Sequence, residues 1–177
     1  MPTVNGIVVH QTDTTNVSQQ FNTLANGKAG AHFVIDKKGT IFQTARVNHK
    51  VDHTGKIKSR CYETKTCSAE ELEKIKALYF QNGVKFAKRA ENLSDYEKTK
   101  PYPERYLSNE DSIGIEIVGK YDAQRKQFEV IISDQNASLK WSVHTLGIEL
   151  LLFDEDVSTH PKISRKKPSE ASTANWE

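Results

Sequence analysis

The sequence has no long apolar run. Nowhere in its 177 residues does a stretch approach the roughly 20 consecutive apolar residues that a membrane-spanning helix needs. The first residues, 1–5, also lack the basic and apolar regions of a secretory signal peptide. With 36% hydrophobic and 27% charged residues, the composition is that of a globular domain and excludes a disordered chain. We therefore expect one domain around a single core, with no membrane span.

An excess of charge of one sign is missing as well. The chain carries 25 Lys and Arg against 23 Asp and Glu, a formal net charge of +2. A dedicated nucleic-acid-binding protein concentrates Lys and Arg far more strongly, so we expect no nucleic-acid partner. The mild positive balance is compatible with an anionic polymer as a substrate.

Cysteine is scarce, and the two that occur, Cys61 and Cys67, lie close together in a polar segment. The CxxC spacings of structural zinc sites are absent. Two alternatives stay open: a local disulfide in an oxidising compartment, or two free thiols in a reducing one.

Apolar and β-branched residues gather in short runs that predict strands, and longer amphipathic segments between them predict helices. A polar stretch with Pro101 and Pro103 reads as a surface excursion over residues 91–110. The mixture of central strands and flanking helices predicts one α/β domain. The predicted strands are 5–10, 31–36, 40–43, 47–51, 112–118 and 157–160; the predicted helices follow residues 16, 68 and 138, the second opening on a capping box at 68–71.

Two of the six histidines, His10 and His160, share one setting, because each ends a short β-branched strand. Strand ends of an open α/β sheet meet on one rim, where such folds place their sites. A catalytic zinc needs three protein ligands and an open position, and Glu170, across a turn-forming segment from His160, can supply the third. Glu116, an acid in an otherwise apolar central strand, is the candidate general base. The alternative is that both histidines are ordinary strand-end residues and that Glu116 faces solvent or pairs with a lysine.

Several segments resemble, in order, those of the zinc-dependent N-acetylmuramoyl-L-alanine amidase and peptidoglycan recognition protein family. They cover most of the chain except about residues 57–108, and the hairpin and the Ser-Ile-Gly-Ile-Glu strand are the most specific. The matching segments are Ile7-Val8-Val9-His10-Gln11-Thr12, the hairpin Ala31 to Ile41, His53-Thr54-Gly55, Asp111-Ser112-Ile113-Gly114-Ile115-Glu116 and Thr159-His160-Pro161.

The resemblance implies a central mixed β-sheet flanked by α-helices, with Zn²⁺ at the sheet rim. It also implies hydrolysis of the amide between N-acetylmuramic acid and L-alanine of peptidoglycan. His10 and His160 would be zinc ligands, with Glu116 the catalytic acid/base. His32 and His53 would line the substrate cleft, although a histidine in a hairpin equally often satisfies a backbone carbonyl.

The chain departs from the family pattern near its C-terminus. The position of the third ligand falls on Glu170, where the family commonly has Asp or Cys, and Asp156 is a weaker substitute. The family also has a catalytic lysine shortly before this ligand. If that lysine position is shifted by one residue in this chain, Lys167 would reach the oxyanion that forms on the amide carbon. The alternative is that residues 165–167 are a solvated basic loop. Residues 57–110 look longer than the family's usual connection, which predicts an insertion.

A binding module of the same fold that does not cut peptidoglycan is the main alternative to the amidase. Such members typically lose a metal ligand, whereas His10, His160 and Glu116 are all present here. A hydrolase that cuts within the peptide stem is a third possibility. Without a signal peptide, the expected settings are recycling of wall fragments in the cytoplasm, phage lysis, or a toxin delivered into a rival's periplasm. The last would imply an immunity protein as a partner.

Overall fold

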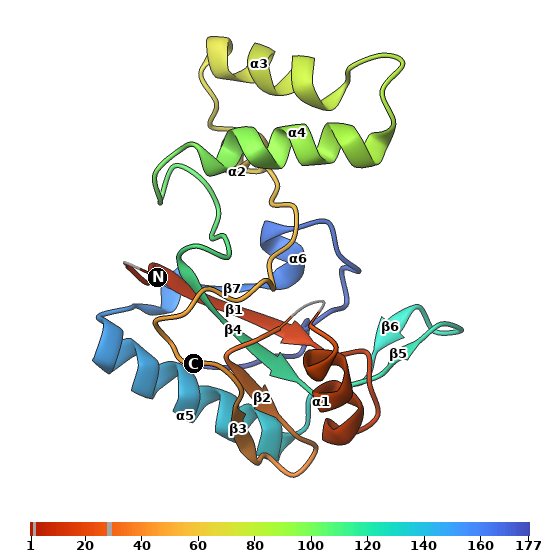
Figure 1. Ribbon diagram of the computed structural model, residues 1–177, viewed down its shortest axis with the longest axis vertical. Helices are drawn as coiled ribbons and strands as arrows, with labels where there is room; N and C mark the ends of the chain where they lie inside the picture. The colour runs from red at the N-terminus through yellow and green to blue at the C-terminus, as the bar shows by residue number, and fades with distance from the viewer. Residues whose placement is uncertain (2, 28–29) are drawn as a thin grey trace.

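The computed structural model describes residues 1, 3–27 and 30–177, and its centre is a five-stranded mixed sheet (Figure 1). The strand order is β3-β2-β4-β1-β7; all neighbours are parallel except the β2–β3 hairpin. The predicted α/β fold with a central mixed sheet is thus confirmed. The strands of this sheet are β1 (Gly6–Gln11), β2 (Phe33–Ile35), β3 (Ile41–Gln43), β4 (Ser112–Ile117) and β7 (Val157–Thr159).

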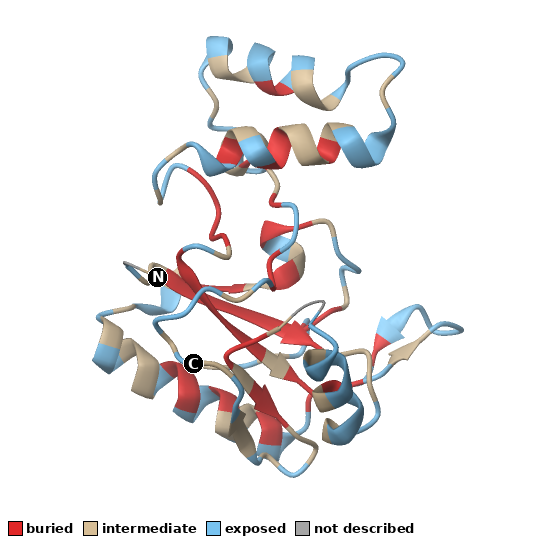
Figure 2. Ribbon diagram, viewed as in Figure 1, coloured by how far each residue is buried: buried red, intermediate tan, exposed pale blue. Residues whose placement is uncertain are grey.

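The two longest strands, β1 and β4, are buried because both faces of the sheet are covered (Figure 2). Ile7 and Val9 belong to the main core, which also includes Leu139 and Val143 of helix α5 (Ser133–Leu150). Val8, between them, packs instead with Tyr106, Leu107 and Ile163. Successive side chains of a strand point to opposite faces, so His10 shares the face of Val8, away from α5.

The remaining elements surround the sheet or project from it. Helix α1 begins after Asn16, whose side chain caps the amide of Gln19, and α6 follows β7 directly. A small two-stranded hairpin, β5–β6, was not expected from the sequence. These elements are α1 (Val17–Ala25), α6 (His160–Ile163), β5 (Tyr121–Asp122), β6 (Gln127–Phe128) and a 3₁₀ turn at Asp154–Asp156.

Helices α2 (Arg60–Thr64), α3 (Ala69–Tyr79) and α4 (Phe86–Lys98) lie outside the sheet, with α3 and α4 packed as an antiparallel pair (Figure 1). The Ser68 hydroxyl accepts from the amide of Glu71 at 3.2 Å, as the capping box predicted. Cys61 and Cys67 form a disulfide at the start of this region. The three helices lie within residues 57–110. That this segment is an insertion relative to the family stays a prediction.

The sequence prediction of a surface excursion over residues 91–110 was wrong for its first half. Residues up to Lys98 form the greater part of α4, and Ala90, Leu93, Ser94 and Glu97 are buried against the neighbouring elements. Their spacing of three and four is helical, but Ser and Glu disguise it as a polar pattern.

The predicted short strand at 47–51 is also absent. The chain turns there, with the His49 amide donating to the Arg46 carbonyl at 3.0 Å. Val47 packs on the main core and Val51 lies against Gly30, so these β-branched residues are held by packing and not by strand pairing. Among the described residues, no helix is long and apolar enough to cross a membrane.

Candidate functional site

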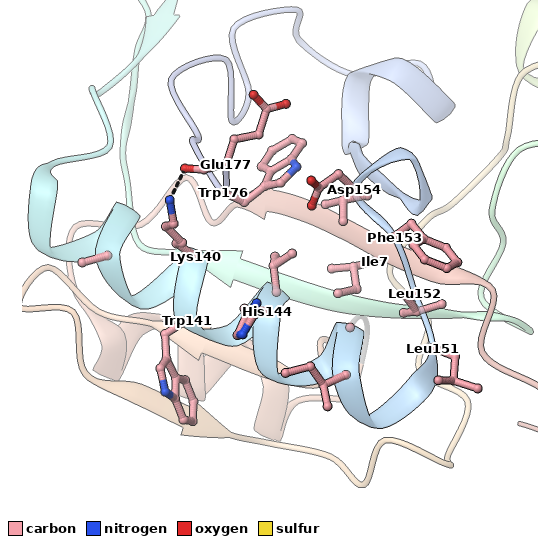
Figure 3. Close-up of a pocket in the computed structure, with 15 residues that line it drawn as sticks. Ile7, Lys140, Trp141, His144, Leu151, Leu152, Phe153, Asp154, Trp176 and Glu177 are labelled. Atoms are coloured by element: carbon pink, nitrogen blue, oxygen red, sulfur yellow. Dashed lines mark hydrogen bonds between the residues drawn. The ribbon is translucent and has the colours of Figure 1, made fainter.

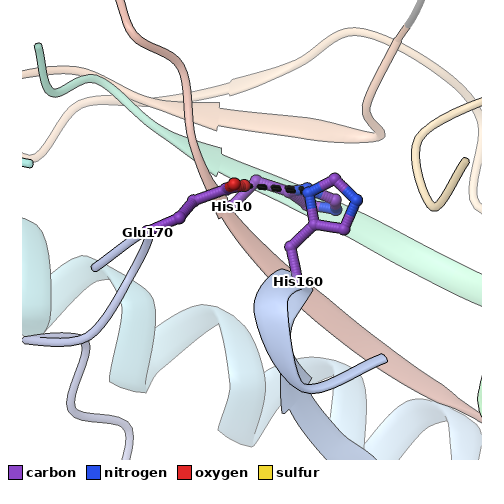
Figure 4. Close-up of side chains that lie close together, drawn as sticks. All are labelled: His10, His160 and Glu170. Carbon is purple, nitrogen blue, oxygen red and sulfur yellow. Dashed lines mark hydrogen bonds and ion pairs between the residues drawn. The ribbon is translucent and has the colours of Figure 1, made fainter. Parts of the chain in front are cut away.

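The sheet register brings three predicted site residues to one rim. His10 of β1 lies opposite Glu116 of β4, and Val9 lies opposite Thr159 of β7, so that His160 follows at the same level. Because all three strands run parallel, their carboxyl ends meet there. Glu170 reaches the rim from the loop that follows α6 (Figure 4).

Three ligand atoms converge at this point. The Nδ1 atoms of His10 and His160 are 2.7 Å apart. Oε1 of Glu170 lies 2.8 Å from Nδ1 of His160 and 3.7 Å from Nδ1 of His10 (Figure 4). All three residues are buried.

Hydrogen bonds behind His10 determine which of its nitrogens carries the proton. Nε2 of His53 lies 3.2 Å from the carbonyl oxygen of Ser112, which can only accept, so Nε2 carries the proton of a neutral His53. Nδ1 of His53 must then accept from Nε2 of His10, at 3.0 Å. This leaves Nδ1 of a neutral His10 with a lone pair.

The same reasoning applies to His160, whose Nε2 lies 3.2 Å from the carbonyl oxygen of Thr54. A neutral His160 donates there and keeps a lone pair on Nδ1. When both histidines are neutral, two imidazole lone pairs and a carboxylate oxygen therefore face one another, with no proton between them. Lone pairs converging in this way match the ligand set of a divalent cation.

The pKa values of the ligand set point the same way. Burial, reinforced by His160, lowers the pKa of His10 to about 4. Burial also lowers the pKa of His53 well below its ordinary value, and His10 adds to this. Burial by itself would raise the pKa of Glu170, but the close imidazoles of His10 and His160 outweigh it and lower that pKa to about 2. The site thus favours a neutral His10 beside an ionised Glu170, the states in which these groups bind metals.

The pKa of Glu116 is shifted in the opposite direction to that of Glu170. Burial, assisted by the negative charge of Glu170 and opposed by the positive charge of Lys166, raises the pKa of Glu116 to about 8. Its Oε2 atom is buried and has no hydrogen-bond partner among the described residues. A carboxyl group poised near neutral pH beside a ligand set is the arrangement expected of a general acid/base.

A cleft of about 340 Å³ opens onto these groups. It exposes the rim to solvent next to the candidate acid/base and two lysines. Its walls include Gln11, Asp13, Gln20, His53, Glu116, His160, Lys166, Lys167 and Glu170. A larger hollow of about 740 Å³ runs along α5, lined by Trp141, Leu151 and Trp176 among others, and contains none of the predicted site residues (Figure 3).

The two candidate lysines differ in their surroundings. Nζ of Lys167 lies 3.3 Å from the centre of the Tyr121 ring and 3.7 Å from Oδ2 of Asp13. The charge of Lys166, in contrast, acts on both His10 and Glu116. Of the two cleft lysines, Lys166 is therefore the one whose charge acts on the site groups, one residue before the predicted position.

The two histidines predicted to line the cleft also differ in their positions. His53 lines the cleft and orients His10, whereas His32 is fully buried. Nδ1 of His32 accepts from the Gly114 amide at 3.0 Å, and its Nε2 lies 2.9 Å from the carbonyl oxygen of His49. These contacts fit the alternative in which His32 satisfies the backbone.

Other residues of the site had no signal in the sequence. Gln11 accepts from the Ala171 amide at 2.9 Å and so positions the residue next to Glu170.

Asp156, the weaker candidate ligand, accepts instead from the Tyr102 hydroxyl at 2.9 Å and takes no part in the site.

The sequence profile of the N-acetylmuramoyl-L-alanine amidase family matches residues 1–170. The chain belongs to this family. The resemblance predicted from the strand and hairpin motifs is thereby confirmed. No curated protein matches this chain.

Several solved structures share the fold of this family member. AmpDh3 of Pseudomonas aeruginosa superposes with a TM-score of 0.62 at 17% identity, over 96% of this chain and 56% of AmpDh3. AmiD of E. coli, solved with anhydro-N-acetylmuramic acid-L-Ala-D-γ-Glu-L-Lys, gives 0.57 at 16% identity, over 90% of this chain and 49% of AmiD. AmpD gives 0.56 at 16% identity, covering 98% and 81%. The chain thus spans about half the length of the first two.

Proposed function

We propose that this protein is a zinc-dependent N-acetylmuramoyl-L-alanine amidase, which hydrolyses the amide between the lactyl group of N-acetylmuramic acid and L-alanine. The observation that carries the proposal is the convergence of the lone pairs of His10, His160 and Glu170 beside Glu116. Nitrogen and carboxylate ligands of this kind suit zinc, and three of them leave a fourth position open. When bound, zinc supplies Lewis-acid activation of water and of the amide carbonyl.

The protein's own groups move the protons. Glu116, ionised, accepts a proton from the attacking water and then donates it to the nitrogen of the departing L-alanine. Its raised pKa suits both steps, because the group gains and loses a proton readily near pH 8. Lys166 faces the same cleft and stabilises the negative charge that develops on the amide oxygen.

The substrate is proposed from the family and from AmiD, whose structure holds a muropeptide. We assign the cleft beside Glu116 to the scissile amide, with His53 holding His10 in its metal-binding orientation. A binding module without activity is less well supported, because it would have no use for an unpartnered, buried acid next to an intact ligand set.

Mass spectrometry of muropeptides tests the proposal. Incubation should release free stem peptides with an L-alanine amino terminus, and a chelator should abolish the release. Intact muropeptide retained by the protein would favour the binding module, and fragments cut within the stem would favour a different hydrolase.

Three variants and a matched control sharpen this test. His10→Ala should lose both zinc and activity, and Glu170→Ala should lose zinc, measured as metal per chain. Glu116→Ala should keep zinc and lose turnover. His144→Ala, which removes an exposed imidazole of α5 that lines the separate hollow along that helix, should change neither. Unchanged zinc in Glu170→Ala would place the third ligand elsewhere.

The biological setting extends this proposal. Recycling of wall fragments, phage lysis and delivery as a toxin all use the same reaction, and an immunity protein is expected as a partner only in the last.

A further inference from the structure

Arg165 joins the loop of the catalytic site to the outer helices. Its guanidinium carbon lies 4.7 Å from the centre of the Tyr79 ring and 5.9 Å from that of Phe86. Its Nε donates to the Tyr79 hydroxyl at 3.4 Å, while its Nη1 is buried without a hydrogen-bond partner among the described residues. Two aromatic ring faces and one hydrogen bond therefore hold this side chain.

The residues just before Arg165 are held by the segment that precedes α2. The Lys58 amide donates to the carbonyl of Ile163 at 2.8 Å, and Ile57 forms an isolated β-bridge with Ser164. The Ile57 amide in turn donates to the hydroxyl of Ser94 in α4, at 3.0 Å. The helix pair α3–α4 thus supports this part of the loop through two routes, one over the Arg165 side chain and one through Ile57.

The residue after Lys166 has its own anchor on a different element. Lys167 rests on the Tyr121 ring of the β5–β6 hairpin and forms an ion pair with Asp13. Lys166 is therefore the middle one of three consecutive cationic residues whose neighbours are held by aromatic rings on two different elements. Fixing both neighbours limits the backbone freedom of an exposed, four-carbon side chain that would otherwise sample many rotamers.

We infer that Arg165 is a positioning residue, and that the α3–α4 pair, through Tyr79 and Phe86, holds Lys166 at the cleft beside Glu116. This inference rests on the proposed amidase activity. It also assigns a role to the segment between the motifs, which supports the catalytic loop from outside the sheet. A charge placed correctly at the developing oxyanion acts only in the transition state, so its misplacement lowers kcat more than it raises KM.

Kinetics of Arg165→Ala with a muropeptide substrate test the inference. We expect kcat to fall by about tenfold, as for a partly displaced oxyanion donor, with KM within about twofold and zinc per chain unchanged. Arg165→Lys, which keeps a cation against the rings, should recover part of the loss. Phe86→Ala removes one ring face and should reproduce a smaller loss, which keeps the test usable if Arg165→Ala folds poorly. Arg125→Ala, which removes an exposed arginine of the β5–β6 turn, should leave kcat unchanged.

A double variant separates positioning from general stability. In a Lys166→Met background, Arg165→Ala should cause no further loss of kcat, because Arg165 would act through the missing ammonium group. An equal loss in both backgrounds, or no loss in either, would overturn the inference.

A second readout does not depend on activity. Trypsin should cut after Lys166 several-fold faster in metal-free Arg165→Ala and Phe86→Ala than in the wild type, because the loop opens more often. Cutting at the wild-type rate would also count against the inference. If the wild type itself released no stem peptide, the proposed function would be wrong. If the wild type were active and substitution of Arg165 left kcat unchanged, only the inference about Arg165 would be wrong.

Discussion

Replacing Glu116 by Gln should make the metal-free protein more stable at alkaline pH. The substitution keeps the shape of the side chain and removes its charge. The folded protein raises the pKa of this carboxyl from 4.5 to about 8, chiefly by burial. Ionisation of Glu116 therefore costs more in the folded state than in the unfolded state, and the variant avoids that cost.

The sign and size of the effect follow from proton linkage. An acid whose pKa is raised on folding binds more protons when folded, so its destabilising effect is absent below about pH 4.5 and complete above about pH 8. The full shift corresponds to about 5 kcal/mol at about 1.4 kcal/mol per pKa unit. Solvent screens part of it because the side chain is partly exposed to the cleft, so we expect about 2–4 kcal/mol at pH 8.5.

Urea denaturation in the presence of a chelator, at pH 5 and pH 8.5, measures this difference. The wild type should lose stability relative to Glu116→Gln as the pH rises, and the gap should nearly close at pH 5. Glu149→Gln, at an exposed position on α5, should follow the wild type at both values. Parallel pH profiles for the wild type and Glu116→Gln would refute the assignment of Glu116 as a costly buried acid.

The same variant should lose activity with zinc bound. General acid–base catalysis typically contributes about 10²–10⁴-fold, so kcat should fall within that range while zinc content stays constant. A more stable protein that has lost turnover would indicate that the burial of Glu116 serves the reaction and not the fold.

Three other changes address the site and its support. Gly114→Ala should weaken zinc binding by about 10–100-fold in a metal-competition titration, because the new Cβ would lie 2.9 Å from the ring of His53; unchanged affinity would exclude this role for His53. Replacing Cys61 and Cys67 by Ser opens a short loop and should lower the free energy of unfolding by about 2 kcal/mol, measured in urea, without altering kcat; a large loss of activity would contradict this. Lys166→Met should raise the pKa of the acid limb of kcat/KM, since the lysine's charge lowers the pKa of the base, and an unmoved limb would show that the lysine lies too far away.

Local sequence determined most of the sheet. The β-branched runs of β1 and β4 and the turn of the β2–β3 hairpin form as predicted, because strand propensity and burial agree there. The errors fell where packing decides against local preference. Val47 and Val51 pack without pairing as a strand. The buried face of α4 includes the polar residues Ser94 and Glu97, so its sequence does not show an apolar helical pattern.

For the candidate site, the sequence alone indicated His10, His160, Glu170 and Glu116, because each residue type carries its chemistry wherever it lies and strand ends meet at one rim. It could not indicate that Nδ1 of each histidine faces Glu170, since this depends on carbonyl oxygens of Ser112 and Thr54 brought from distant segments. It also could not separate adjacent lysines. Only the tertiary structure did so, because the rings of Tyr79 and Tyr121 lie on different elements and hold the two neighbours of Lys166.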